Sequence, residues 1–173
     1  MHYISIFLKK ILFPGINLHA RLRYERLPTF FRSASGAKPL RVLDAGCGNG
    51  MLSYQSYLKG NEVVGISFKD SEVKGCQALF NRYLGIPEQK LCFRHGNLYQ
   101  LDFPPESFHE IICAEVLEHL RHDTAVCQAF WRILKPGGVL HVCAPNADHP
   151  YNATFPLDLD EKGGHIRPGY TLT

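Results

Sequence analysis

The sequence predicts a doubly wound α/β fold, in which a mostly parallel sheet carries helices on both faces. From Leu40 onwards, short apolar runs alternate with stretches of helical pattern. Such runs are typical of parallel strands that are buried on both faces. The first run leads into VLDAGCGNG at residues 42–50. A glycine-rich turn between a buried strand and a helix is typical of the ligand-binding edge of such a sheet.

The composition is that of a globular protein. A chain of 173 residues, 45% of them hydrophobic and 20% charged, is long enough for one domain with a substantial core. No apolar run approaches the ~20 residues that span a bilayer, and no cleavage site follows the N-terminus, so we expect a cytoplasmic protein without a membrane span. The six cysteines include no CxxC pair, which favours buried, reduced thiols over disulfides or a zinc ribbon.

The N-terminal section, residues 1–39, is expected to form a helical lid and a linker. Apolar residues recur at helical spacing over residues 4–12, and a second helix is predicted over residues 17–26. Up to Arg41 the chain has eight Lys or Arg against the single Glu25. This basic section predicts contact with an anionic partner, either membrane headgroups at a peripheral surface or a charged substrate. The alternative is a solvated helix face.

The central section, residues 40–146, carries the predicted sheet, and residues 147–173 are expected to be irregular. The turn before the last strand is assigned to LKPGG at residues 134–138. Strands are predicted at residues 40–45, 62–67, 91–95, 108–114 and 139–144, with helices at residues 51–59, 70–84 and 122–134.

The glycine turn has the spacing GxGxG, with Asp44 two residues ahead of Gly46. Dinucleotide-binding turns have the spacing GxGxxG and place a pyrophosphate at the helix N-terminus. A carboxylate beside a pyrophosphate would repel it, whereas a carboxylate beside an ammonium group attracts it. The turn therefore favours an amino-acid-bearing nucleoside and argues against a nicotinamide-dependent dehydrogenase.

Four ordered blocks together resemble class I S-adenosylmethionine-dependent methyltransferases. They are VLDAGCGNG, VVGIS, HGNLYQLDFPPESFHEIICAEVLEHL and LKPGGVLHV, and the resemblance runs from about Leu40 to Asn146. It implies a Rossmann-like, seven-stranded sheet, S-adenosylmethionine as cofactor, and methyl transfer. The family's last two strands form an antiparallel hairpin that residues 147–173 do not offer. We therefore expect a truncated chain whose fifth strand is an edge.

The resemblance implies that Asp44, Gly46, Cys47 and Gly48 surround the methionine part of the cofactor. Ser67 ends the second strand, where the family usually has an acidic residue that binds both ribose hydroxyls. A serine accepts less well than a carboxylate, so weaker binding is expected. Two acids follow closely, Asp70 and Glu72, but acids also suit a helix start for reasons of their own.

The adenine and methyl-transfer ends are assigned in the same way. Phe68 and Leu98 are expected to sandwich the adenine ring, and Asn97 stands where Asp commonly contacts the adenine amino group. The amide oxygen of Asn can still accept that hydrogen bond. The resemblance further implies that Glu115 frames the methionine end. We take Glu115 and His119 as the candidate catalytic residues.

The segment AEVLEHLRHD places Glu115, Glu118 and His119 at i, i+3 and i+4. If this segment is helical, the three side chains share one face, and carboxylates with an imidazole can bind a divalent cation. The block resembles that of quinone-biosynthesis O-methyltransferases and small-RNA 2′-O-methyltransferases, where a later His completes a metal site. His165 is the candidate for that ligand and His149 the second. Other relatives have no metal, and His119 is then a base, a substrate contact or a structural residue.

The predicted function is therefore methyl transfer from S-adenosylmethionine to a small-molecule or lipid-like acceptor, with O- or C-methylation undecided. Two alternatives stay open. One is a non-catalytic cofactor-binding or scaffold domain, which Ser67 and the short C-terminal section favour. The other is metal-assisted 2′-O-methylation of RNA. We expect no nucleic-acid partner, because the sequence offers no surface of interleaved aromatic and basic residues.

Overall fold

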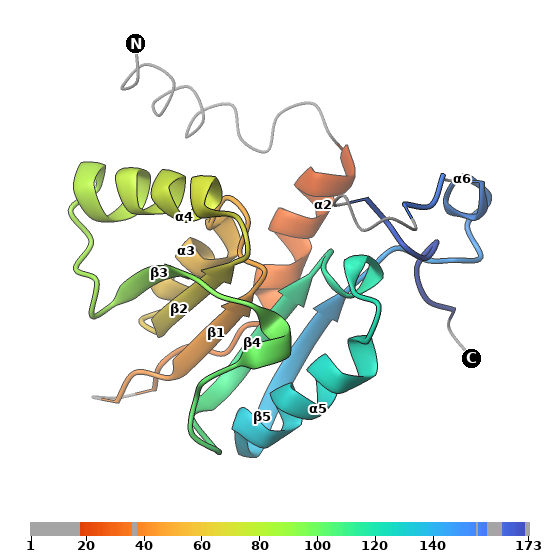
Figure 1. Ribbon diagram of the computed structural model, residues 1–173. Helices are drawn as coiled ribbons and strands as arrows, with labels where there is room; N and C mark the ends of the chain where they lie inside the picture. Colours follow the sequence, from red (N-terminus) through yellow and green to blue (C-terminus); the bar gives the residue numbers. More distant parts are fainter. Residues whose placement is uncertain (1–17, 36–37, 155, 159–163, 172–173) are drawn as a thin grey trace.

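A computed structural model of the chain describes residues 18–35, 38–154, 156–158 and 164–171 (Figure 1). Its five strands form one sheet in the order β3-β2-β1-β4-β5, and all neighbouring pairs are parallel. All five carboxyl ends therefore meet at one edge of the sheet. The strands are β1 (Arg41–Ala45), β2 (Glu62–Ser67), β3 (Leu91–His95), β4 (Phe108–Ala114) and β5 (Leu134–Cys143).

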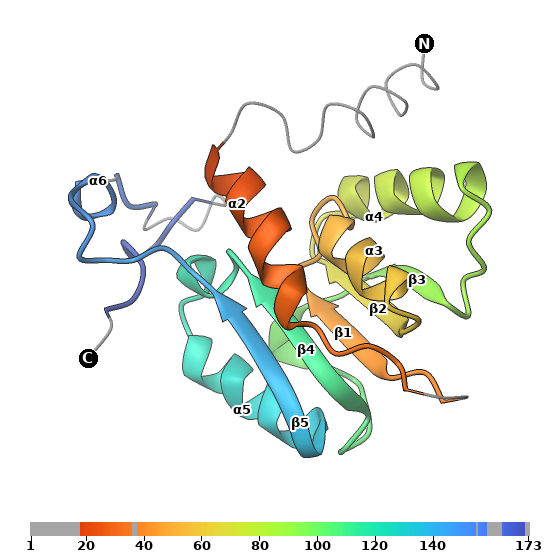
Figure 2. The same ribbon diagram turned by 180° about the vertical axis from the view of Figure 1, so that it is seen from behind.

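Helices cover both faces of the sheet, as the sequence predicts. Figures 1 and 2 show α2 and α3 on one face and α5 on the other. The predicted helix over residues 70–84 forms as α4 followed directly by a π-helical segment, η2. The helical elements are α2 (Leu18–Arg26), η1 (Leu27–Phe30), α3 (Met51–Leu58), α4 (Asp70–Cys76), η2 (Gln77–Tyr83), η3 (Leu98–Gln100), η4 (Leu117–His119), α5 (Asp123–Ile133) and α6 (Pro150–Ala153).

Two apolar cores hold these layers together. On one face, Val126, Phe130 and Ile133 of α5 pack against Ile111 and its neighbours, and all four are fully buried. On the other face, residues of α3, α4, η2 and the segment after η1 pack against β1, β2 and β3. Fully burying one large apolar side chain stabilises the fold by about 1.5–3 kcal/mol. The two cores therefore fix the strand ends that carry the site.

The prediction for the last strand was wrong at its start. LKPGG is not a turn that precedes β5, because Leu134 already pairs with Phe108. The ladder then shifts register and resumes where Glu110 pairs with Val139. The extra residues bulge out between these two pairs, and Gly137 accommodates the bulge with a φ of +73°. An irregular strand of this kind has no periodic sequence pattern. The Pro and Gly residues of LKPGG therefore indicated a turn, although the structure counts these residues as part of β5.

The predicted second helix of the N-terminal section is confirmed as α2. The helix predicted over residues 4–12, and any contact it makes with an anionic surface, lies outside the described residues. Within the part of the chain that is described, no helix is long and apolar enough to cross a membrane.

The described residues after β5 add no strand to the sheet, so β5 lies at the edge of the sheet that these residues form. They contribute one parallel bridge, between Asn146 and Tyr170. Side chains of this segment nevertheless bind the core. The Tyr170 hydroxyl donates to Asp123 Oδ2 at 2.6 Å, and Arg167 binds both that carboxylate and the carbonyl oxygen of Leu120. These contacts hold residues 164–171 against the start of α5.

Candidate functional site

The glycine turn after β1 has one open position between two packed ones. Gly46, Gly48 and Gly50 have φ values of +83°, +52° and +76°, in the region that L side chains rarely adopt. A Cβ at Gly46 would overlap Val116, and one at Gly50 would lie 2.8 Å from Phe80. At Gly48, no atom of the described chain lies within 4 Å of the added Cβ. A ligand can therefore approach the backbone at Gly48.

Asp44 lies near the end of β1 and is 2% exposed. Its Oδ2 accepts a hydrogen bond from the Ser53 hydroxyl at 2.6 Å. Burial raises the pKa of Asp44 to about 6, and the Ser53 hydrogen bonds oppose this shift. A buried carboxylate is stabilised by a nearby positive charge. The open turn and this carboxylate fit the ammonium-bearing methionine part of S-adenosylmethionine, and Ser53 is a member of the site that sequence reasoning missed.

At the end of β2, the side chain of Ser67 makes polar contacts that the sequence did not indicate. The Ser67 hydroxyl donates to Glu72 Oε2 at 2.5 Å and accepts from the Lys69 backbone N–H at 3.1 Å. Sequence reasoning noted Glu72 as an acid near Ser67 that could equally be explained by its place at a helix start. Its side chain instead returns to the strand end, which the sequence could have indicated only through the five-residue separation from Ser67.

The two residues predicted to sandwich adenine lie in different surroundings. Phe68 is 71% exposed and its ring lies 5.7 Å from that of His95. Leu98 is buried in the core beneath β4. Asn97 caps η3, since its Oδ1 accepts from the Tyr99 backbone N–H at 2.9 Å. Phe68 thus offers an open ring, whereas Leu98 and Asn97 already have structural roles.

The helix that would place Glu115, Glu118 and His119 on one face does not form. Glu115 has a φ of +55° and lies outside η4, which begins at Leu117. The backbone N–H of Glu115 donates to the Cys143 carbonyl oxygen at 2.8 Å, so this residue still follows the sheet ladder. Its carboxylate forms an ion pair with Arg23 of α2, with 2.8 Å between Arg23 Nη2 and Glu115 Oε2. Sequence reasoning gave no sign of Arg23.

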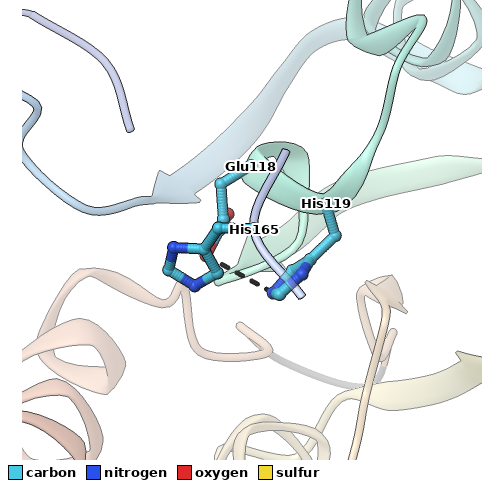
Figure 3. A group of neighbouring side chains, drawn as sticks. All are labelled: Glu118, His119 and His165. Carbon is cyan, nitrogen blue, oxygen red and sulfur yellow. Dashed lines mark ion pairs between the residues drawn. The ribbon is translucent and has the colours of Figure 1, made fainter. Parts of the chain in front are cut away.

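Three of the five metal candidates do come together. Figure 3 shows Glu118 and His119 of η4 beside His165, which comes from the C-terminal segment. One ligand atom from each residue lies within 4.8 Å of the others. A backbone hydrogen bond helps to join the two segments, since the Ile166 N–H donates to the Glu118 carbonyl oxygen at 3.0 Å.

Glu118 is the unusual member of this group. Its side chain is fully buried, and neither carboxylate oxygen has a hydrogen-bond partner among the described residues. His119 Nε2 is 3.9 Å from Oε1. Burial raises the pKa of Glu118 to about 7, and the charge of Glu115 adds to that effect. A buried carboxylate without partners is costly, and a bound cation would remove that cost.

The two imidazoles, those of His119 and His165, are also suited to bind a cation. His119 Nδ1 lies 2.8 Å from the Gly164 carbonyl oxygen, and donation from Nδ1 leaves a lone pair on Nε2. Burial lowers the pKa of His165, and the neighbouring His119 lowers it further. Neutral imidazoles are the form that binds metals.

The remaining candidates lie outside the group. Glu115 is not among the three clustered residues, since Arg23 binds its carboxylate. His149 caps α6, where its Nδ1 accepts from the Tyr151 backbone N–H at 3.3 Å. Two imidazole nitrogens and one carboxylate therefore form the donor set. This set fits a divalent transition metal, for which Mn²⁺ can serve as a probe, better than it fits Mg²⁺.

Taken together, the fold and this edge define a class: a Rossmann-like α/β domain with an open glycine turn at the carboxyl ends of its strands. A family model described as "Methyltransferase domain" matches residues 43–142. A ubiquinone biosynthesis O-methyltransferase of Paracidovorax citrulli is 37% identical over 107 residues, which are 60% of this chain and 44% of that protein.

Solved structures are similar in fold. The YcgJ protein from Bacillus subtilis has a TM-score of 0.66 at 20% identity, and the match covers 76% of this chain and 54% of that one. A putative methyltransferase from Bacillus halodurans has a TM-score of 0.63 at 21% identity, covering 74% of this chain and 53% of that one.

The chain belongs to the methyltransferase-domain family, and the class is that of class I S-adenosylmethionine-dependent methyltransferases. The family's cofactor is S-adenosylmethionine, as the sequence indicates. The chain spans about half the length of the curated relatives it matches.

Proposed function

We propose that this protein transfers a methyl group from S-adenosylmethionine to a hydroxyl of a small-molecule or lipid-like acceptor, with a divalent cation held by Glu118, His119 and His165. The observation that carries this proposal is the fully buried Glu118 carboxylate, whose two oxygens have no hydrogen-bond partner in the described chain. Folding places this carboxylate beside two imidazoles at a cost that a cation would offset.

Three protein ligands leave coordination positions open for an acceptor oxygen. When bound, the cation supplies a Lewis acid that lowers the pKa of an acceptor hydroxyl. The ligand atoms lie within 4.8 Å of one another, and around an ion with ligands at about 2.1 Å they have to move closer. Because Gly164 holds His119 through Nδ1, the Nε2 atom is the one available to the cation. Without a cation, the same Nε2 is the candidate base.

The cofactor's methionine part is assigned to the turn with Asp44, Gly46, Cys47 and Gly48. Asp44 attracts the ammonium group, and the open backbone at Gly48 admits the ligand. Most of the rate then comes from alignment of the sulfonium with the acceptor oxygen, which can contribute about 7–11 kcal/mol at best.

The division into an N-terminal lid, a core over residues 40–146 and a C-terminal segment is part of the proposal. Two contacts of α2 support it, since Arg23 binds Glu115 and the Tyr24 hydroxyl donates to Asn49 Oδ1 at 3.4 Å. Helix α2 would thus close over the acceptor, while residues 1–17 of the predicted lid lie outside the described residues. The C-terminal segment would contribute His165.

The relatives' names support oxygen as the methylated atom. Several of them are called ubiquinone biosynthesis O-methyltransferases. A cation that binds and acidifies a hydroxyl places the oxygen itself as the nucleophile, which serves O-methylation directly. We therefore favour an acceptor with a hydroxyl group and an apolar tail, and an alkyl catechol is a suitable probe.

The proposal is tested by titrating the protein with Mn²⁺ and following the free ion by electron paramagnetic resonance. We expect one site per chain, an affinity at least tenfold lower in His165→Gln and Glu118→Gln, and an unchanged affinity in His149→Gln, the matched control from the same C-terminal section. S-adenosylhomocysteine should still bind to His165→Gln. Equal Mn²⁺ affinity in all four proteins would overturn the cation site.

A second measurement separates the alternatives. With S-adenosylmethionine and the alkyl catechol, mass spectrometry should detect a methyl ether whose formation requires Mn²⁺. Cofactor binding without transfer to any hydroxylated acceptor would favour a non-catalytic domain. Transfer to the 2′-hydroxyl of a short RNA, but not to the catechol, would favour the RNA alternative.

A further inference from the structure

Ser67 is the last residue of β2, and its hydroxyl makes two hydrogen bonds within the protein. It is 4% exposed, donates its only hydrogen to Glu72 Oε2 at 2.5 Å, and accepts from the Lys69 N–H at 3.1 Å. A hydroxyl offers one donor and two acceptor lone pairs. Ser67 therefore has little capacity left for a ligand, and its role is to orient the Glu72 carboxylate.

The Glu72 carboxylate is held at the edge of the sheet where the ligand is expected, and it can still accept further hydrogen bonds there. Its side chain is 34% exposed. Among the described residues, its other oxygen, Oε1, has one ion-pair partner, the Lys69 ammonium at 3.9 Å. Lys69 is itself 64% exposed in its side chain, so this pair is weak. A carboxylate oxygen accepts more than one hydrogen bond. Glu72 therefore keeps acceptor capacity at the end of β2.

The position of Glu72 relative to the glycine turn also supports a role in ligand binding. β1 and β2 are paired neighbours up to Ala45 and Ile66, so the turn that follows β1 lies beside the end of β2. A hydrogen bond with Cys76 and burial raise the pKa of the Cys47 thiol in that turn, and the negative charge of Glu72 adds a smaller effect. Glu72 therefore lies near the residues that we assign to the methionine part of the cofactor.

We propose that Glu72 binds the two ribose hydroxyls of S-adenosylmethionine, so that the acid missing at position 67 is supplied from the first turn of α4. This inference rests on the proposed function, because it needs the cofactor in the turn. A vicinal diol donates two hydrogen bonds, and a carboxylate is the side chain that accepts both. Ser67 and Glu72 act as one unit, in which the serine is the positioning residue.

Calorimetric titration with S-adenosylhomocysteine tests this assignment without measuring turnover. We expect Glu72→Gln to lower the affinity at least tenfold and Ser67→Ala to lower it less, because the carboxylate remains. Asp70→Asn is the matched control, since Asp70 is an exposed acid in the same first helical turn, and its affinity should stay within twofold of wild type. Thermal melting shows that each variant is folded.

A second ligand makes the result specific for the sugar. With the 2′,3′-dideoxy analogue of S-adenosylhomocysteine, wild type and Glu72→Gln should bind equally well. An equal loss with both ligands, or a Glu72→Gln affinity within twofold of wild type for S-adenosylhomocysteine, would overturn the role of Glu72 alone. Failure of wild type to bind S-adenosylhomocysteine at all would overturn the proposed function and this inference together.

Discussion

Arg23 of α2 and Glu115, which follows β4, form an ion pair with 2.8 Å between guanidinium nitrogen and carboxylate oxygen. Both side chains are mostly buried, at 20% and 28% exposed. The pair joins the N-terminal section to the edge of the sheet where cofactor and acceptor are proposed to meet. It also places one positive charge beside the carboxylates of Glu115 and Glu118, and that charge opposes the rise in the pKa of Glu118.

The first prediction concerns this ion pair. Arg23→Gln should loosen α2, because the pair is less exposed than a typical surface pair, and its loss costs about 1 kcal/mol. Amide hydrogen exchange in α2 should become about fivefold faster as a result. Arg21→Gln is the control, since Arg21 pairs with Glu25 within the same helix on an exposed face. Identical exchange in α2 for both variants would show that the Arg23–Glu115 pair does not hold the helix.

The second prediction concerns the stability of Asp44→Asn. Burial raises the pKa of Asp44 from 3.8 to about 6 in the folded state. The folded protein therefore binds more protons than the unfolded chain between these pH values, and its stability falls as pH rises through this window. The loss is about 3 kcal/mol at most. Asp44→Asn should melt several degrees higher than wild type at pH 7.5, with the difference shrinking towards pH 4. A lower melting temperature at pH 7.5 would contradict this account.

The third prediction follows from the same carboxylate. If Asp44 binds the ammonium group of the cofactor, the ionised form is the binding form. The affinity for S-adenosylhomocysteine should then be constant above pH 7 and fall below pH 6, towards tenfold per pH unit. Calorimetric titrations between pH 5 and 8 measure this profile. Asp44→Asn should bind weakly at every pH, and a profile for wild type that stays flat down to pH 5 would exclude the role of Asp44.

The fourth prediction separates the two kinds of glycine in the turn. Gly50→Ala should destabilise the fold by about 3 kcal/mol or more, because its Cβ would overlap Phe80, Cys76 and Phe93 at a positive φ. Gly48→Ala adds only about 1 kcal/mol of backbone strain, but its methyl group projects into open space where the cofactor is expected. Denaturant unfolding and cofactor titration should therefore rank the two variants in opposite orders. The same rank in both measurements would contradict the assignment.

The fifth prediction concerns the segment that carries His165. Arg167→Gln removes bonds to Asp123 and to the Leu120 carbonyl oxygen, which costs about 2 kcal/mol. Because Arg167 does not belong to the ligand group, any fall in Mn²⁺ affinity would come from a displaced His165. We expect a fall of threefold or more, and no change in Asp148→Asn, an exposed site in the same C-terminal section. Unchanged affinity in Arg167→Gln would show that the cation site forms without this anchor.

The sequence was most informative where local pattern and burial agree. The strands at residues 62–67, 91–95 and 108–114 have the predicted bounds, because each is a short apolar run with clear turn residues on both sides. The glycine turn was found for the same reason, since glycine adopts the positive φ values at Gly46, Gly48 and Gly50 without the steric strain that other residues incur.

Contacts between distant segments could not be predicted from the sequence. The helical spacing of Glu115, Glu118 and His119 is misleading, because Glu115 still belongs to the strand ladder and adopts a positive φ. Arg23 meets Glu115 from a helix that lies about ninety positions earlier in the chain. Local periodicity contains no information about such a pair. Glu72 is intermediate, since its distance from Ser67 is short but its side-chain direction depends on how α4 packs.

The central claim is that Asp44 and the glycine turn form the binding site for the amino-acid part of an adenosyl cofactor. The most direct test compares S-adenosylhomocysteine with 5′-methylthioadenosine, which has the same nucleoside but no ammonium group, by calorimetric titration of wild type and Asp44→Asn. We predict that wild type prefers S-adenosylhomocysteine at least tenfold and that Asp44→Asn loses this preference. Equal affinity of wild type for the two ligands, or tighter binding of a dinucleotide than of either, would contradict the claim.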